Sequence, residues 1–243
     1  MTQDEFGHQV SPHDRDFANA LFRMKGSLAN KVLHAGLQDL IQDIVYDADL
    51  LEAGCGPGIF TSKLIKHCPR TLLAVDINKA LLEKAERRFA PDIPLDFAHH
   101  DLTSPLDSFS RTFDGVICAS VLMHLEPEDS FLAIQHMGAV VRNHGWIALA
   151  VINRKWARSV YFPDVLSRGT ARLIPTGEDS YFREWYPRDA HYCQALFEAG
   201  FSIRTHHLRI PPHAKALGSP YAQNLGKALW TVFIGRKTRE TTH

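Results

Sequence analysis

Short apolar runs recur along the chain, with amphipathic stretches between them. Runs of consecutive apolar residues are typical of buried parallel strands, and apolar positions three or four apart are typical of helices. The predicted strands are residues 50–51, 72–75, 95–98, 113–119 and 146–152. The predicted helices include residues 16–45 (as one or two helices), 60–65, 79–89 and 126–141. Strands that alternate with helices predict an α/β fold on a doubly wound, mostly parallel sheet.

The chain departs from this alternation at its start and in one insertion. Residues 1–14 are polar and are predicted to be loosely attached. Residues 153–186 mix aromatic side chains with arginines, before a helix predicted over residues 187–197. A long insertion in an α/β domain is usually functional. Its aromatic side chains and arginines favour contact with a small anionic or aromatic substrate, and single-stranded nucleic-acid binding is the alternative.

The most informative stretch is a strand, a glycine turn, a helix and a second strand that ends on Asp76. This is the layout of a nucleotide-binding half of a doubly wound fold. Glycines let the backbone pass close under a ligand, and an acid at the strand end can accept hydrogen bonds from both ribose hydroxyls. A dinucleotide fingerprint needs a small residue where Ile59 stands, and Pro57 lacks an N–H for a pyrophosphate. The spacing therefore argues against NAD.

The motif Glu52-x-Gly54-x-Gly56-x-Gly58 resembles the first motif of class I S-adenosylmethionine-dependent methyltransferases, in which an acid also ends the second strand. The resemblance covers roughly residues 49–152 and extends more loosely to residue 237. It implies S-adenosyl-L-methionine as cofactor and a Rossmann-like, seven-stranded sheet. The strands predicted at residues 201–210 and 229–235 would form its antiparallel C-terminal hairpin.

The resemblance also implies one domain over residues 1–243, in four parts. These are an N-terminal helical cap, a cofactor-binding core, a lid or substrate insertion after the fifth strand, and a C-terminal helix with strands. Their residue ranges are 1–47, 48–152, 153–187 and 188–243.

Family positions carried onto this sequence give a set of cofactor-binding residues. Ile77 would cover one face of the adenine, Asp101 would accept a hydrogen bond from its amino group, and the Leu102 N–H would serve the ring. A helix or turn cap is the alternative for Asp101. The full predicted set is Glu52, Gly54, Cys55, Gly56, Gly58, Asp76, Ile77, Asp101, Leu102, Ala119 and Ser120. Arg15, Arg23 and Lys25 are further candidates for the methionine carboxylate, although a solvated helix face is the preferred explanation for each of them.

Methyl transfer from a sulfonium mainly requires the acceptor atom to be held in line with the methyl carbon. A base is needed only when the acceptor arrives protonated. His124 is the candidate catalytic base, because it follows the fourth strand and has a near-neutral reference pKa; structural packing is the alternative. Metal-assisted catechol methyltransferases need acidic ligands at the end of the fourth strand, whereas Asp114 stands at its start. We therefore expect metal-independent transfer and no metal site.

The charge balance and the cysteine spacing indicate which kinds of binding partner and which cellular compartment to expect. Lys plus Arg and Asp plus Glu number 27 each, and the isoelectric point is near 7.3, so there is no global basic field to attract nucleic acid. The four scattered cysteines and the absence of an apolar signal or span predict a cytoplasmic protein without membrane partners. The leading hypothesis is an enzyme that methylates O, N or C of a small molecule. The alternatives are an RNA or protein methyltransferase and a non-catalytic S-adenosylmethionine-binding protein.

Overall fold

The computed structural model describes residues 8–24, 27–89, 93–161, 165–166, 171–175, 180–212 and 224–238. Its main sheet has seven strands in the order β10-β11-β6-β5-β2-β3-β4. Neighbours from β6 to β4 pair in parallel, and β11 pairs antiparallel with both β6 and β10. The strands are β2 (Asp49–Ala53), β3 (Thr71–Asp76), β4 (Leu95–His99), β5 (Phe113–Ala119), β6 (Val141–Ile152), β10 (Phe201–Arg209) and β11 (Ala228–Lys237). The predicted doubly wound sheet with its antiparallel hairpin is confirmed.

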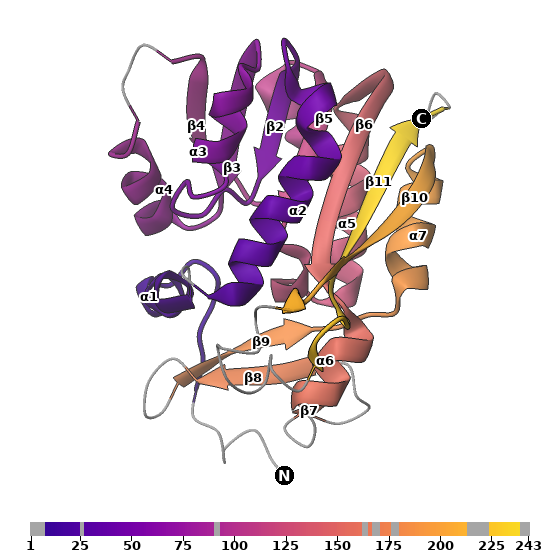
Figure 1. Cartoon of the computed structure of the whole chain (residues 1–243). Helices are drawn as coiled ribbons and strands as arrows, with labels where there is room; N and C mark the ends of the chain where they lie inside the picture. Colours follow the sequence, from indigo (N-terminus) through magenta and orange to yellow (C-terminus); the bar gives the residue numbers. More distant parts are fainter. Residues whose placement is uncertain are drawn as a thin grey trace.

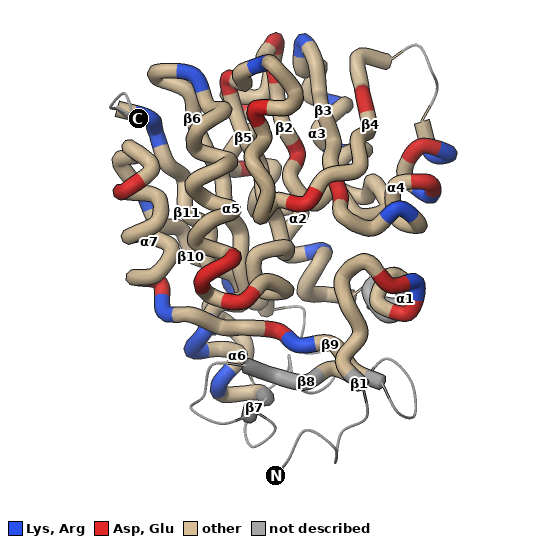
Figure 2. Tube along the Cα trace, turned by 180° about the vertical axis from the view of Figure 1, so that it is seen from behind, with Lys and Arg blue, Asp and Glu red and all other residues tan. Residues whose placement is uncertain are grey.

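Helices cover both faces of this sheet (Figures 1 and 2). Successive strand residues point to opposite faces, so Leu50 packs against the layer that contains α2 and Leu51 against the layer that contains α5 and α7. This alternation explains why the strands are apolar throughout. The helices are α1 (Arg15–Met24), α2 (Leu28–Val45), α3 (Thr61–Leu64), α4 (Lys79–Glu86), α5 (Pro127–Ala139), α6 (Arg154–Tyr161) and α7 (Asp189–Glu198).

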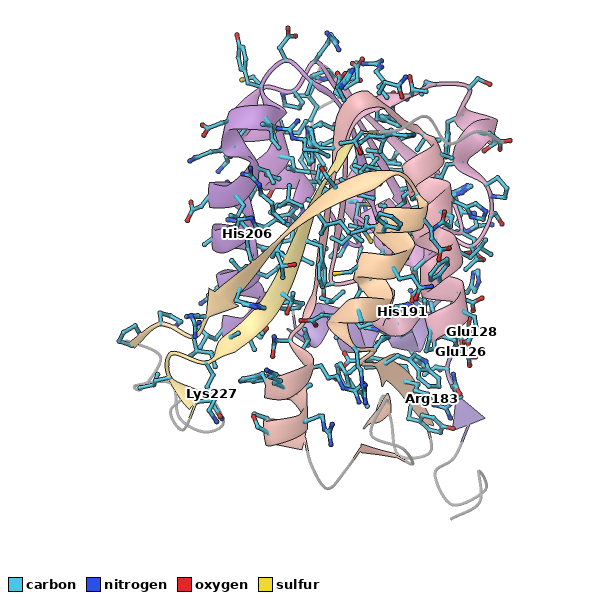
Figure 3. The ribbon with its side chains drawn as sticks, turned by 90° about the vertical axis from the view of Figure 1, so that its right-hand side faces the viewer. Glu126, Glu128, Arg183, His191, His206 and Lys227 are labelled. Atoms are coloured by element: carbon cyan, nitrogen blue, oxygen red, sulfur yellow. The ribbon has the colours of Figure 1, made fainter. Side chains whose placement is uncertain are left out.

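Polar contacts fix the layer formed by α5 and α7. The Ser130 hydroxyl lies 2.8 Å from His191 Nε2 and joins the two helices. Figure 3 shows His191 on α7 beside Glu126 and Glu128 at the start of α5. At the other end of α5, the buried Lys237 ammonium donates to the carbonyl oxygens of Gly138 and Val141, at 2.8 and 2.9 Å.

The strand β6 begins earlier than predicted, and α5 ends earlier. The predicted strand started at residue 146, but β6 already pairs with β5 through Val141 and Phe113. The polar residues after Val141 concealed this start. Arg142 donates to Asp114 at 2.6 Å and to Asp49 at 2.8 Å, at the amino ends of the parallel strands. Arg70 donates to the same two carboxylates, each at 2.9 Å, so this end of the sheet is closed by an ion-pair network.

A second, smaller sheet lies beneath the carboxyl ends of the parallel strands (Figure 1). Its order is β1-β9-β8-β7, from β1 (His8–Gln9), β7 (Val165–Leu166), β8 (Ala171–Pro175) and β9 (Ser180–Trp185). Most of it comes from the insertion predicted at residues 153–187.

The prediction that residues 1–14 are loosely attached is wrong for residues 8–14. The strand β1 pairs in parallel with β9, and Val10 is only 3% exposed, packed with Phe17 and Phe182. The local sequence could not reveal this docking, because the partner strand lies at residues 180–185.

Candidate active site

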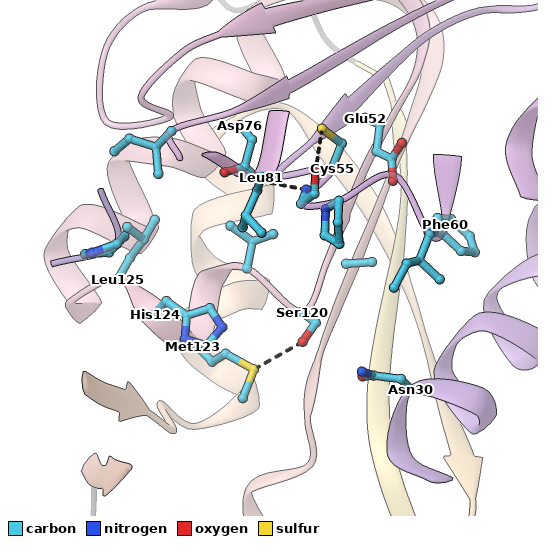
Figure 4. A pocket seen from close by; sticks show the side chains of 18 of the residues that line it. Asn30, Glu52, Cys55, Phe60, Asp76, Leu81, Ser120, Met123, His124 and Leu125 are labelled. Atoms are coloured by element: carbon cyan, nitrogen blue, oxygen red, sulfur yellow. Dashed lines mark hydrogen bonds between the residues drawn. The ribbon is translucent and has the colours of Figure 1, made fainter. Parts of the chain in front are cut away.

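A cavity of about 520 Å³ opens between the carboxyl ends of β2, β3 and β5 and the second sheet. Figure 4 shows Glu52 and Asp76 along one wall and Ser120 and His124 along the opposite wall. Every predicted site residue lines this cavity except Gly58. A Cβ at Gly58 would lie 3.2 Å from that of Ala85, so this glycine allows close packing against α4. The topology thus gathers residues from four separate loops into one pocket.

The glycine turn brings its backbone to the edge of the cavity. Gly54 and Cys55 donate their N–H groups to the carbonyl of Val75, at 2.8 and 2.9 Å, which ties the turn to β3. Gly54 has φ +81° and Gly56 has φ +53°. A Cβ at Gly56 would meet nothing within 4 Å. A ligand can therefore approach the backbone at Gly56, while Gly54 lies tightly against Val121 of the loop after β5.

Asp76 is partly buried at the end of β3, and both of its carboxylate oxygens are held by the backbone. Oδ2 accepts from the Gly56 N–H at 2.7 Å and Oδ1 from the Asn78 N–H at 2.8 Å. Burial raises the pKa of Asp76 above its usual value, although these hydrogen bonds oppose the shift. A carboxylate has about four lone-pair positions, so two backbone bonds leave capacity for ligand hydroxyls.

Glu52 is a buried acid in the same wall. Its Oε2 accepts a 2.6 Å hydrogen bond from the Thr61 hydroxyl. Burial raises the pKa of Glu52 to about 8, and the nearby charge of Asp76 contributes to the rise. The side chain is therefore mostly protonated near neutral pH, and a cationic ligand group beside it would favour its ionised form.

Asp101 has the turn-capping contacts that were the alternative prediction for it. Its Oδ1 accepts from both the backbone N–H and the hydroxyl of Thr103, at 2.9 and 2.8 Å. Asp101 and Leu102 also line the cavity. The two roles are compatible, because these contacts use only one of the two carboxylate oxygens.

His124 lies in a single 3₁₀ turn, Leu122–His124, directly after β5. Its ring packs edge-on against Phe17 from α1 and Phe182 from β9, with centroid separations of 5.2 and 5.5 Å. The Nδ1 atom is buried without a hydrogen-bond partner. Burial lowers the pKa of His124 to about 4, so the imidazole is neutral at pH 7 and a weaker base than an exposed histidine.

The predicted cationic contacts are not found where the structure describes them. Arg15 is exposed and lies outside the cavity lining, and the side chains of Arg23 and Lys25 lie outside the described part. In the insertion, Arg154 donates to the Tyr186 carbonyl, and Arg183 lies over the Trp185 ring at 5.3 Å. Among the described lining residues there are four carboxyl groups and neither lysine nor arginine. This part of the wall does not favour the anionic substrate predicted for the insertion.

Several pocket residues were missed from the sequence. They come from the N-terminal segment, α2, β9 and β11, which are far from the glycine motif in the chain. Only Asn78 carried a local signal, since it follows the acid Asp76 by two residues and starts a helix. These additional lining residues include Pro12, Phe17, Asn30, His34, Glu184 and Trp230, and Asn78 lies directly behind the wall.

Searches among known proteins identify the architecture. A family model described as a methyltransferase domain matches residues 50–145. Over these residues the chain is similar to the methyltransferase-domain family. An uncharacterised methyltransferase of Mycobacterium tuberculosis is 33% identical over 101 residues, which cover 41% of this chain and 48% of the relative. The chloroplastic magnesium protoporphyrin IX methyltransferase of Arabidopsis thaliana is 24% identical over 152 residues, covering 63% and 46%. The chain thus spans about half the length of these curated relatives.

Solved structures share the fold of this chain. An S-adenosylmethionine-dependent methyltransferase from Mesorhizobium loti superposes with a TM-score of 0.66 at 16% identity, over 88% of this chain and 99% of that one. The magnesium protoporphyrin IX methyltransferase of Synechocystis, solved with bound S-adenosylmethionine, gives a TM-score of 0.60 at 16% identity, over 93% of each chain.

The described side chains and helices also bear on metal binding and on membrane insertion. Within the described ranges, no group of three or more His, Cys, Asp or Glu side chains could hold a metal ion. None of the described helices combines the length and the apolar character that crossing a bilayer requires.

Proposed function

We propose that this chain binds S-adenosyl-L-methionine in the cavity at Glu52, Gly56 and Asp76 and transfers its methyl group to a small-molecule acceptor. The observation that carries the proposal is the arrangement around Asp76, where a partly buried carboxylate lies beside open space above a glycine backbone. The curated relatives named for magnesium protoporphyrin IX and for ubiquinone biosynthesis support a small-molecule acceptor.

The pocket residues fit this cofactor by their chemistry. Asp76 would accept hydrogen bonds from ribose hydroxyls, and Ile77, Asp101 and Leu102 line the part of the cavity proposed for the adenine. Glu52 adds an ionisable acid that suits a cationic ligand. When bound, the cofactor supplies an activated methyl group on sulfur.

The protein's proposed contribution to the reaction is positioning and exclusion of water. Alignment of the acceptor with the methyl group can account for several kcal/mol of the barrier, up to roughly ten. Phe17 and His124 line the cavity, and Phe182 packs against both rings; this aromatic wall would shield the cavity from water. Nδ1 of His124 has no hydrogen-bond partner in the protein, so it could form a hydrogen bond with a bound ligand or, after a shift of the ring, with a new partner. Its role as a base remains a prediction, and a pKa near 4 restricts that role to acceptors that lose their proton easily.

Calorimetric titration with S-adenosylhomocysteine, with NAD as the control ligand, tests the proposed cofactor. We expect near-stoichiometric binding of the first and none of the second. Replacing Asp76 by asparagine should weaken that binding by about ten- to a hundredfold, the range for losing hydrogen bonds to a charged acceptor. Asp96→Asn, an exposed change on β4 outside the cavity lining, is the matched control and should bind normally.

Binding of NAD alone would overturn the cofactor assignment. If S-adenosylhomocysteine binds, pools of small metabolites can be fractionated for uptake of a labelled methyl group from S-adenosylmethionine. Uptake into RNA or protein, with none into small molecules, would contradict the proposed acceptor class.

A further inference from the structure

One buried side chain, Asn78, joins the proposed cofactor site to the N-terminal segment. Asn78 is 1% exposed and stands at the start of α4. Its backbone N–H donates to Asp76 Oδ1 at 2.8 Å. Its side-chain oxygen accepts from the Leu81 N–H at 3.1 Å, and its side-chain nitrogen donates to the carbonyls of Pro12 and Asp14, at 2.8 and 2.9 Å. The side-chain oxygen of Asn78 is therefore bonded to α4, and its side-chain nitrogen is bonded to the N-terminal segment.

The segment that Asn78 holds, residues 10–14, is here called the strap. Internal hydrogen bonds shape it into a turn, because Ser11 N–H donates to Asp14 Oδ2 at 2.7 Å and Asp14 N–H donates to the Ser11 carbonyl at 2.9 Å. At its start, the Val10 N–H donates to the Tyr181 carbonyl at 2.7 Å. Beyond it, Phe17 extends to the aromatic wall of the cavity. The strap thus connects α4, the second sheet and the cavity wall.

Helix capping alone does not explain an asparagine here. Serine, threonine and aspartate cap helices about as well, because capping requires only a side-chain oxygen. Of these residue types, only asparagine adds two N–H donors. At position 78 both donors are used on the strap carbonyls. The amide nitrogen therefore has a role separate from that of the amide oxygen.

We propose that Asn78 is a positioning residue that couples ligand binding at Asp76 to docking of the strap over the cavity. The inference rests on the proposed function for its ligand, and on the hydrogen bonds of Asn78 for its mechanism. A ligand that hydrogen-bonds to Asp76 restrains the carboxylate, which in turn restrains the backbone of Asn78. The side-chain amide of the same residue then holds the strap, and the strap holds Phe17 in the wall that faces the acceptor.

Hydrogen exchange of residues 8–18 measures strap docking without any knowledge of the acceptor. The test variants are Asn78→Ser and Asn78→Asp, which both keep a capping oxygen and remove the amide donors. In the free protein, Asn78→Ser should speed exchange at the Val10 amide on the order of tenfold, and Asn78→Asp should do so further, because its carboxylate faces two carbonyl oxygens. Ser27→Ala, which removes the capping hydroxyl of α2 but leaves the strap intact, is the control for general loosening.

The coupling itself is measured by adding S-adenosylhomocysteine. In the parent protein the ligand should slow exchange at Val10, and in Asn78→Ser this slowing should largely disappear while overall unfolding stability changes little. An acceptor, once found, should show a larger rise in KM than fall in kcat for Asn78→Ser, and Asn78→Gln should not rescue it because its longer side chain misplaces the donors.

Unchanged exchange at Val10 in free Asn78→Ser would overturn the proposal, as would ligand-induced slowing that survives in that variant. Failure of the parent protein to bind S-adenosylhomocysteine would overturn the proposed function and the ligand-coupled half of this inference. The exchange of the free variants would still decide whether Asn78 holds the strap, so the two failures are distinguishable.

Discussion

Replacing Gly54 by alanine tests how closely the loop after β5 approaches the glycine turn. A Cβ at this position would lie 2.2 Å from Val121 Cγ2 and 3.0 Å from Cγ1, which requires the loop to move. Gly56 offers a matched control in the same turn. It also has a positive φ, +53° against +81° for Gly54, but a Cβ there would meet nothing within 4 Å.

The expected cost separates into a backbone part and a packing part. Placing an alanine at positive φ costs about 1–2 kcal/mol, and this applies to both glycines. Overpacking adds about 1–3 kcal/mol, and this applies only to Gly54. Gly54→Ala should therefore be less stable than Gly56→Ala by about 1–3 kcal/mol. Adding Val121→Ala should recover much of that difference, because it removes both of the clashing methyl groups.

Urea unfolding followed by fluorescence and by circular dichroism gives the free energies needed for this double-mutant cycle. A favourable coupling of at least about 1 kcal/mol between Gly54→Ala and Val121→Ala is expected. Equal destabilisation by Gly54→Ala and Gly56→Ala would refute the reasoning, and so would additive effects in the double variant. Either result would mean that the loop after β5 does not constrain the turn.

Three further predictions concern buried or paired charges. Burial raises the pKa of Glu52 to about 8 in the folded state, so between about pH 4.5 and 8 the folded state holds a proton that the unfolded state has released. The free energy of unfolding should therefore fall as the pH rises through this range, by at most about 1.4 kcal/mol per pH unit from this group. Glu52→Gln keeps an acceptor for Thr61 and should lose that slope in urea titrations across this range; parallel pH profiles would contradict the shift. Lys237→Met should destabilise by about 1–3 kcal/mol in the same assay by leaving two carbonyls without their donor, and an unchanged midpoint would show that water replaces the ammonium. Hydrogen bonds from Arg70 and Arg142 hold the pKa of Asp49 well below its usual range. Asp49→Asn should therefore lower the free energy of unfolding by under about 1 kcal/mol at pH 7, and this loss should shrink as the pH falls below about 4. A loss that stays constant with pH would exclude the ion pairs as its cause.

The sequence was sufficient to predict the core of the fold and the side of the pocket formed by the glycine turn and the end of β3. Strand positions follow from local apolar runs, and Gly54 and Asp76 follow from a motif and a strand end that are adjacent in the chain. Parallel strands bring their carboxyl ends to one edge, so residues after different strands could be placed together before any coordinates were known. The contacts of Asp101 with Thr103 also follow from local turn chemistry, which the sequence had offered as an alternative.

The acceptor side of the pocket could not be predicted in the same way. His124 was placed correctly beside the cavity, but its environment depends on Phe17 and Phe182, which are far from it and from each other in the sequence. No local pattern reveals that a lone Val10 in a polar segment is buried, because its partners are tertiary. The low pKa of His124 results from burial of its own ring, which its position in the sequence alone does not predict.

The strand order of the main sheet has a consequence for biosynthesis. The strand β11, last in the chain among those described, lies between β6 and β10, and every residue from Trp230 to Arg236 pairs with β6. During synthesis the edge of β6 therefore remains open until residues 228–237 have left the ribosome. An open apolar edge is a template for pairing with other chains. Premature termination before residue 228 should thus yield aggregating products, and a chaperone that shields this edge would act late in synthesis, after the cofactor motif has already emerged.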